Sequence, residues 1–173
     1  MKQDRAIKKL NNSGAFTLAE LLAVILIISL IMITLAGGLT VVRSAYEKIT
    51  LKAESATLMS TIITKVTDEL RFASDVEVLE GGVVTFQSGI RGYRISIVNI
   101  PAGEGNQRPN IGIKKEQGGG TVQSLVSEKT ISEEVAPEIK LAYKDGVFNA
   151  AVCIKKENVT VAEQQFYVTP VNN

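Results

Sequence analysis

The sequence contains no histidine and no tryptophan, and it has one cysteine and four prolines among its 173 residues. Without histidine the chain has no histidine general base and no cysteine–histidine dyad, and the usual ligands of a zinc site are missing. A single cysteine excludes a disulfide within the chain, so a folded domain must be held together by packing. Aromatic residues make up only 5% of the chain, which predicts a core of valine and isoleucine. These absences favour a structural or binding protein over an enzyme, and we expect no cofactor, no metal and no catalytic residue.

The charges are nearly balanced but unevenly distributed along the chain. There are 19 basic and 18 acidic side chains, for a formal net charge of +1. Residues 1–15 hold four of the basic residues and one of the acidic residues, which leaves 15 basic and 17 acidic residues, or −2, in the remainder. Proteins that bind nucleic acid usually show a strong basic excess. Nucleic acid is therefore not the expected partner.

An uncharged and largely apolar run extends from Leu21 to Val42. As an α-helix, these 22 residues would be about 33 Å long, enough to cross a hydrocarbon core of about 30 Å. The segment before the run is basic, which predicts a cytoplasmic N-terminus and an exported C-terminal part. Glu20 stands at the head of the run, where an ionised carboxylate is costly unless it is paired. We expect no residue within the run to pair with it.

Two ordinary interpretations of a basic start and an apolar run are a secretory signal peptide and an uncleaved membrane anchor. A signal peptide has an apolar middle of about 7–15 residues that ends in a small-residue cleavage site. This run is longer, and Ala36-Gly37-Gly38 is its one candidate for such a site. A plain anchor explains the length and the charge of the segment but gives Glu20 no role.

The block Ala15-Phe16-Thr17-Leu18-Ala19-Glu20-Leu21-Leu22, behind its short basic leader, resembles the class III signal of type IV prepilins and type II secretion pseudopilins. The resemblance covers residues 8–42. It implies that a prepilin peptidase cuts at the cytoplasmic face, that the new terminal amine is methylated, and that the apolar helix is kept. It also implies that Glu20, as the fifth mature residue, meets the terminal amine of a neighbouring subunit in a filament.

The two cues to the cut site differ by one residue. The spacing to Glu20 places the cut between Ala15 and Phe16, whereas the family usually has glycine immediately before the cut, and Gly14 stands one position too early. We favour Phe16 as the first mature residue because the spacing to Glu20 sets the charge pairing. Alanine is also the mildest replacement for glycine. Cleavage after Gly14 is the alternative.

The helical pattern continues beyond the apolar run, because apolar residues recur at spacings of three, four or seven. It predicts one helix of about 58 residues, roughly 87 Å long, from Phe16 to Ala73, ended by Ser74-Asp75. Gly37-Gly38 inside it predicts either a bend or melted turn, or close packing of helices in the membrane. The predicted apolar face comprises Val42, Ala45, Ile49, Ala56, Met59, Ile63, Val66 and Leu70. The charged residues assigned to the other faces are Arg43, Glu47, Lys48, Lys52, Glu54, Lys65, Asp68 and Glu69.

From Val76 the apolar pattern changes to a period of two, which is typical of strands. Glu80-Gly81-Gly82 and Lys144-Asp145-Gly146 predict hairpin turns. Cys153 is expected on a strand as a small, half-buried apolar residue. The expected strands are 76–78, 83–86, 91–100, 111–115, 121–126, 138–143, 147–155 and 159–168.

The predicted fold class is α+β and pilin-like, with one long N-terminal helix packed against a C-terminal antiparallel β-sheet. The predicted divisions are a leader peptide at 1–15, a transmembrane helix half at 16–42, an amphipathic helix half at 43–74 and a β domain at 75–173. We expect the loops at 101–110 and 117–138 to contact a partner, because binding residues concentrate on loops.

The resemblance implies a structural subunit with a single span of the cytoplasmic membrane, which then joins an extracellular or periplasmic filament. The implied partners are membrane lipid, the prepilin peptidase, the inner-membrane assembly platform and other pilin or pseudopilin subunits. Segments 61–74 and 166–170 look similar to minor subunits more than to the major one. The alternatives are a competence pseudopilin for DNA uptake and an uncleaved, anchored domain that binds a ligand at the cell surface.

Overall fold

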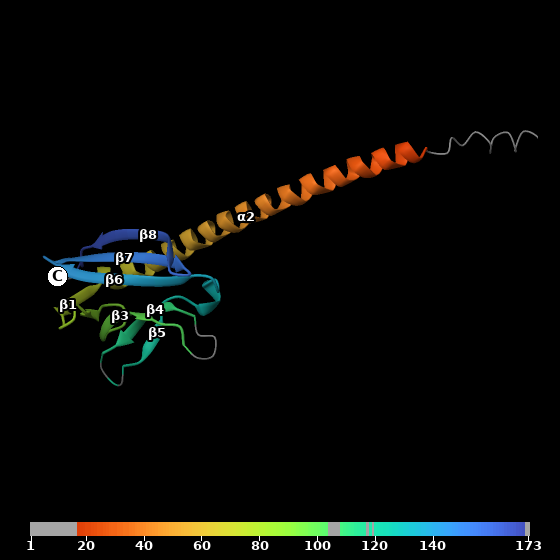
Figure 1. Cartoon of the computed structure of the whole chain (residues 1–173). Coiled ribbons are helices and arrows are strands. Elements are labelled where there is room, and N and C mark those ends of the chain that lie inside the picture. The colour runs from red at the N-terminus through yellow and green to blue at the C-terminus, as the bar shows by residue number, and fades with distance from the viewer. Residues whose placement is uncertain (1–16, 104–107, 117, 119, 172–173) are drawn as a thin grey trace, which may run out of the picture. The chain divides into compact units, whose positions relative to one another are not determined.

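The structure is a computed structural model that describes residues 17–103, 108–116, 118 and 120–171. The chain divides into two compact units between Lys48 and Ile49. One helix, α2 (Leu18–Arg71), belongs to both units (Figure 1). Among the described residues, eight strands and a short 3₁₀ helix follow it, all in the second unit. The α+β fold class predicted from the sequence is therefore confirmed.

The strands form two antiparallel sheets, whereas the sequence was expected to give a single sheet (Figure 1). The five-stranded sheet has the order β1 (Ala73–Val78), β2 (Val84–Ser88), β3 (Arg94–Ile100), β4 (Asn110–Lys115) and β5 (Val122–Ser124). The three-stranded sheet has the order β6 (Ala136–Lys144), β7 (Val147–Lys156) and β8 (Val159–Val168). The 3₁₀ helix η1 (Glu128–Thr130) lies in the connection between the two sheets.

The connection between the two sheets is part of the core. Its buried apolar side chains are those of Leu125, Val126, Ile131 and Val135. At the junction, the side-chain amide of Asn99 on β3 donates to the carbonyl of Ile139 on β6 (2.9 Å) and accepts from its N–H (2.8 Å). A side chain thus satisfies backbone groups of β6 that a neighbouring strand would otherwise pair.

Both hairpins predicted from glycine-containing turns are present. The β6–β7 turn has Asp145 at φ 52° and Gly146 at φ 80°, the two positive angles of the tight turn that matches the twist of antiparallel strands. A second tight turn joins β7 to β8 through Glu157 and Asn158, which also have positive φ. The sequence predicts both flanking strands but not this tight turn, because glutamate is not a typical turn residue there.

The core of the second unit lies between α2 and the two sheets. It is mostly valine, isoleucine and leucine, as the shortage of aromatic residues predicts, and two buried phenylalanines join it. The rings of Phe86 on β2 and Phe148 on β7 meet edge to face with centroids 5.6 Å apart, so they link the two sheets directly.

The buried face of α2 differs from the predicted face. Met59, Val66 and Leu70 are buried as expected, but Ile49 is 69% exposed, and Leu58 and Ile62 are core residues that the prediction omitted. The prediction carried one stripe from Val42 to Leu70, whereas α2 packs against the domain only beyond Ile49, on the face that contains Ser55, Leu58, Ile62, Val66 and Glu69. The helix also ends at Arg71, because Ala73 is already buried and paired with Ser88 in the sheet.

Glu69 corrects the prediction that all charged residues of this helix half face solvent. Its side chain is 6% exposed and accepts hydrogen bonds from the Ser88 hydroxyl (2.9 Å) and from Nε of Arg91 (2.7 Å). The guanidinium of Arg91 also donates to the side-chain oxygen of Gln123 (3.0 Å), and the backbone N–H of Arg91 donates to the Ser88 hydroxyl (3.0 Å). A buried carboxylate is tolerated when it is paired and hydrogen-bonded in this way.

Candidate functional sites: the helix N-terminus and a loop cavity

The residues predicted for processing lie outside the described part of the chain. Gly14, Ala15 and Phe16 precede Thr17, where the description begins. The cut site therefore stays a prediction. Glu20, the residue predicted to act in assembly, lies in the first turn of α2.

Thr17 and Glu20 form a reciprocal cap at the start of α2. The Glu20 carboxylate oxygen Oε2 accepts hydrogen bonds from the Thr17 N–H and the Thr17 hydroxyl, both at 2.9 Å. In return, the Glu20 N–H donates to the Thr17 hydroxyl oxygen at 3.3 Å. This is the capping box, in which a threonine before the helix and a glutamate three residues later satisfy each other's backbone donors.

The capping box gives Glu20 a partner that precedes the apolar run, namely the hydroxyl and N–H of Thr17. The expectation for Glu20 concerned residues within the run and did not consider Thr17. The spacing Thr-x-x-Glu before an apolar run is itself the sequence signature of this cap. The cap uses Oε2, whereas Oε1 receives no hydrogen bond from the described residues.

The part of α2 from Leu18 to Val42 presents a largely apolar surface. The large apolar side chains of α2 from Leu18 to Val42 are 45–80% exposed, and an 18-residue window of the helix has a mean hydropathy of 2.8. Its hydroxyl side chains donate to carbonyls of their own helix, as Ser29 does to Ile25 (2.7 Å) and Thr40 to Gly37 (2.8 Å). Because backbone and side-chain donors are satisfied internally, this segment could cross a membrane.

Gly37 and Gly38 lie within the unbroken helix, so a melted turn is not present there. A Cβ placed on either residue would meet nothing within 4 Å in the described chain. At these two positions the backbone of an exposed apolar helix is not covered by a side chain, which is compatible with the close-packing alternative.

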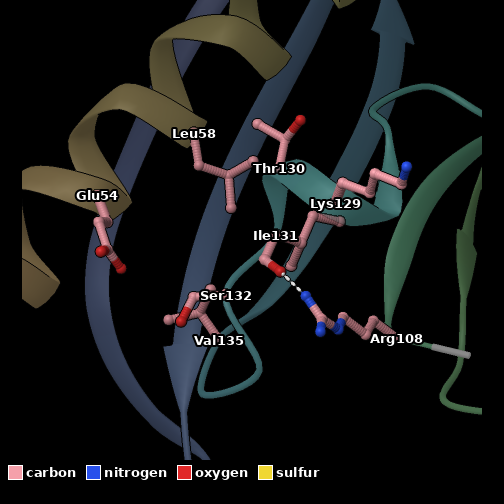
Figure 2. A pocket seen from close by; sticks show the side chains of 8 residues that line it. All are labelled: Glu54, Leu58, Arg108, Lys129, Thr130, Ile131, Ser132 and Val135. Carbon is pink, nitrogen blue, oxygen red and sulfur yellow. Dashed lines mark hydrogen bonds between the residues drawn. The ribbon is translucent and has the colours of Figure 1, made fainter. Parts of the chain in front are cut away.

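The two loops predicted to contact a partner meet at a cavity of about 350 Å³ beside α2 (Figure 2). Arg108 ends the first loop, and its guanidinium donates to the carbonyls of Glu128 (3.3 Å) and Ile131 and pairs with the Glu133 carboxylate (2.8 Å). The cavity is lined by Glu54 and Leu58 of α2, by Arg108, and by Lys129, Thr130, Ile131, Ser132 and Val135. Arg108 thus holds the second loop in place and is not available as a binding cation, so we assign the cavity no ligand.

Little else among the described residues suggests chemistry. Cys153 is half-buried on β7 between the fully buried Val152 and Ile154, as predicted, and its sulfur lies 3.7 Å from the Thr160 hydroxyl. No group of three or more His, Cys, Asp or Glu side chains in the described ranges could hold a metal ion. No family model, no curated protein and no solved structure matches this chain.

Proposed function

We propose that the protein is a minor pilin or pseudopilin, a structural subunit of a type IV pilus or of a type II secretion-like filament. The observation that carries the proposal is the combination of Glu20 with the uncharged run that follows it, behind a basic leader. The continuation of that run as one helix into an antiparallel β domain supports it, because a soluble domain has no use for such a helix.

In this proposal the chain inserts with its basic end in the cytoplasm and its β domain outside. A prepilin peptidase removes residues 1–15, and the amine of Phe16 is methylated. The subunit then leaves the bilayer and joins a filament. Neighbouring helices replace lipid around the exposed apolar side chains of α2, so little apolar surface moves into water.

In this proposal Glu20 sets the register in which a new subunit is added to the filament. The capping box uses Oε2, and Oε1 accepts no hydrogen bond from any residue that the structure describes. The terminal amine of a neighbouring subunit can therefore bind Oε1 without displacing Thr17. Among apolar helices the dielectric is low, and a charge pair there is stronger than in water. A helix shifted along its neighbour would leave both charges unpaired.

The first experiment measures the mass of the protein recovered from cells with and without the peptidase. We expect the loss of 15 residues and the gain of one methyl group only in cells that have the peptidase. A chain that keeps Met1 in both strains would contradict the proposal. A loss of 14 residues would retain it and move the cut to the bond after Gly14.

The second experiment separates the two interactions of Glu20 with a matched pair of variants. Glu20→Gln keeps an oxygen for the Thr17 N–H and hydroxyl but removes the charge. Thr17→Val removes the hydroxyl from the cap but keeps the carboxylate. We expect both variants to insert and to be cleaved, Glu20→Gln to enter filaments poorly, and Thr17→Val to enter them nearly as well as the wild type. The opposite order would show that Glu20 acts only as a helix cap.

An uncleaved anchored domain is the second candidate, and one observation favours it. Thr17 already satisfies Glu20 within a single chain, so the glutamate does not require a neighbour in order to be tolerated. This candidate expects an intact N-terminus and no filament. A competence pseudopilin would behave as the main proposal does in both experiments and would differ in the filament that it joins.

A further inference from the structure

A further cavity, of about 360 Å³, lies on the five-stranded sheet, where β3 and β5 begin and β4 ends (Figure 1). Lys115 is the last residue of β4, Tyr93 precedes β3, and Thr121 precedes β5. The described residues that line this cavity are Tyr93, Ile113, Lys115, Thr121, Val122 and Gln123. None of these six side chains is acidic, so the formal charge of the lining is that of Lys115.

The ammonium of Lys115 forms no ion pair with any residue in the described ranges. Its Nζ lies 4.8 Å from the centroid of the Tyr93 ring, a cation–π contact that holds the side chain at the cavity. The next residue, Glu116, points to the other face of the strand, where it accepts from Ser96 (2.6 Å) and Lys114 (3.4 Å). Because an ammonium has three N–H donors, its contact with one ring leaves donors for a ligand.

Gln123 supplies a second donor, and Arg91 fixes its orientation. A guanidinium can only donate, and Nη1 of Arg91 donates to the side-chain oxygen of Gln123 at 3.0 Å. That oxygen is therefore occupied, and the side-chain NH₂ of Gln123 has no acceptor among the described residues. Arg91 is itself held by the buried carboxylate of Glu69 at 2.7 Å. The amide donor is thus oriented before a ligand binds, which reduces the conformational freedom lost on binding.

Lys115 and Gln123 are diagonal neighbours on the same face of the sheet. Gln123 lies directly opposite Ile113, and Lys115 follows Ile113 by two residues on β4. Residues in this relation lie about 7–8 Å apart, which two long side chains can span. A carboxylate can therefore accept from the ammonium with one oxygen and from the amide with the other. Beside these donors, Ile113 and the Tyr93 ring provide apolar surface for the rest of a ligand.

We propose that this cavity binds a singly charged carboxylate attached to a small apolar or aromatic group. One ammonium and one neutral amide match a single negative charge shared by two oxygens. Phosphate carries more charge and is typically bound by several arginines or backbone N–H groups, whereas the described lining has one cation. The cavity beside α2 differs in that Arg108 is already occupied by two carbonyls and Glu133. The proposed site does not depend on cleavage at the N-terminus or on filament assembly.

Titration with benzoate, followed by backbone amide NMR of the full chain in zwitterionic detergent micelles, tests the site. We expect saturable shifts centred on Ile113, Lys115 and Gln123. Benzamide has the same ring without the charge, and inorganic phosphate has charge without the ring, so neither should give saturable shifts at the same free concentrations. The same micelles without protein correct for partitioning of the probes. Equal binding of benzamide, tighter binding of phosphate, or benzoate shifts centred elsewhere would overturn the proposal.

Substitutions test the two donors separately. Lys115→Met keeps the apolar stem without the ammonium and should raise the dissociation constant for benzoate by about tenfold or more, whereas Lys115→Arg should retain binding. Gln123→Glu keeps an oxygen for Arg91 but replaces the amide donors by a negative charge, so it should abolish saturable binding. Lys114→Met, on the opposite face, is the matched control and should bind as the wild type does. An unchanged dissociation constant in Lys115→Met, or an equal loss in Lys114→Met, would overturn the proposal.

Discussion

Replacing Arg91 by methionine should destabilise the second unit, because it leaves the Glu69 carboxylate buried without its cationic partner. Arg91 reaches Glu69 from the turn between β2 and β3, and its side chain is 24% exposed against 6% for Glu69. Burial lowers the pKa of Arg91, but its interactions with Glu69 and Tyr93 together more than offset this and raise the pKa above its ordinary value. The guanidinium is therefore charged at every pH at which the protein would be studied.

The magnitude follows from what remains around Glu69 after the substitution. Removal of one partner of a buried ion pair typically costs about 3–5 kcal/mol. The Ser88 hydroxyl still donates to the carboxylate, so we expect the lower end, about 3 kcal/mol in the free energy of unfolding. For a domain of this size, that corresponds to a fall of roughly 10 °C in melting temperature.

The assay is urea unfolding of the full chain in detergent micelles, followed by far-ultraviolet circular dichroism. Lys114→Met is the matched control, because Lys114 pairs with Glu116 at 3.4 Å in a more exposed setting and should cost less than about 1 kcal/mol. The double variant Glu69→Leu/Arg91→Met should be more stable than Arg91→Met alone, since both charges are then gone. A loss for Arg91→Met no larger than that of the control, or strict additivity in the double variant, would refute the reasoning.

Three further predictions concern the second unit and use the same unfolding assay. Ile62→Ala should cost about 3–4 kcal/mol, because the side chain is fully buried between α2 and the sheets; a loss below about 1 kcal/mol would show that this face of α2 is not packed. Gly89→Ala should be destabilising, because a Cβ there would lie 2.7 Å from the Phe72 carbonyl oxygen; an unchanged urea midpoint would contradict that close approach. The hydrogen bond from Lys155 to Glu138 raises the pKa of Lys155 above its ordinary 10.5. The stabilisation from this pair is therefore present below pH 10.5 and is lost as the pH rises through the higher pKa of the folded state. The free energy of unfolding of Lys155→Gln should depend less on pH in that alkaline range, and an unchanged alkaline profile would count against the pair.

The sequence alone predicted the structural features that depend on residues close together in the chain. Composition and length predicted the apolar half of α2, because an uncharged run of this length forms a helix that could cross a membrane. Gly81-Gly82 and Asp145-Gly146 determined two hairpins, because their turns require positive φ. The spacing of Thr17 and Glu20 also carries the signature of the capping box that the structure shows, although the cap was not among the predictions.

What the tertiary structure decided depended on contacts between residues distant in the chain. The sequence predicts that Glu69 faces solvent. In the folded chain it contacts Ser88 and Arg91, which follow it by 19 and 22 residues in the sequence. The junction between the two sheets likewise depends on Asn99 meeting Ile139, 40 residues away. Periodicity predicts only which side chains share a face, so the partner that a face contacts is decided only when the chain folds.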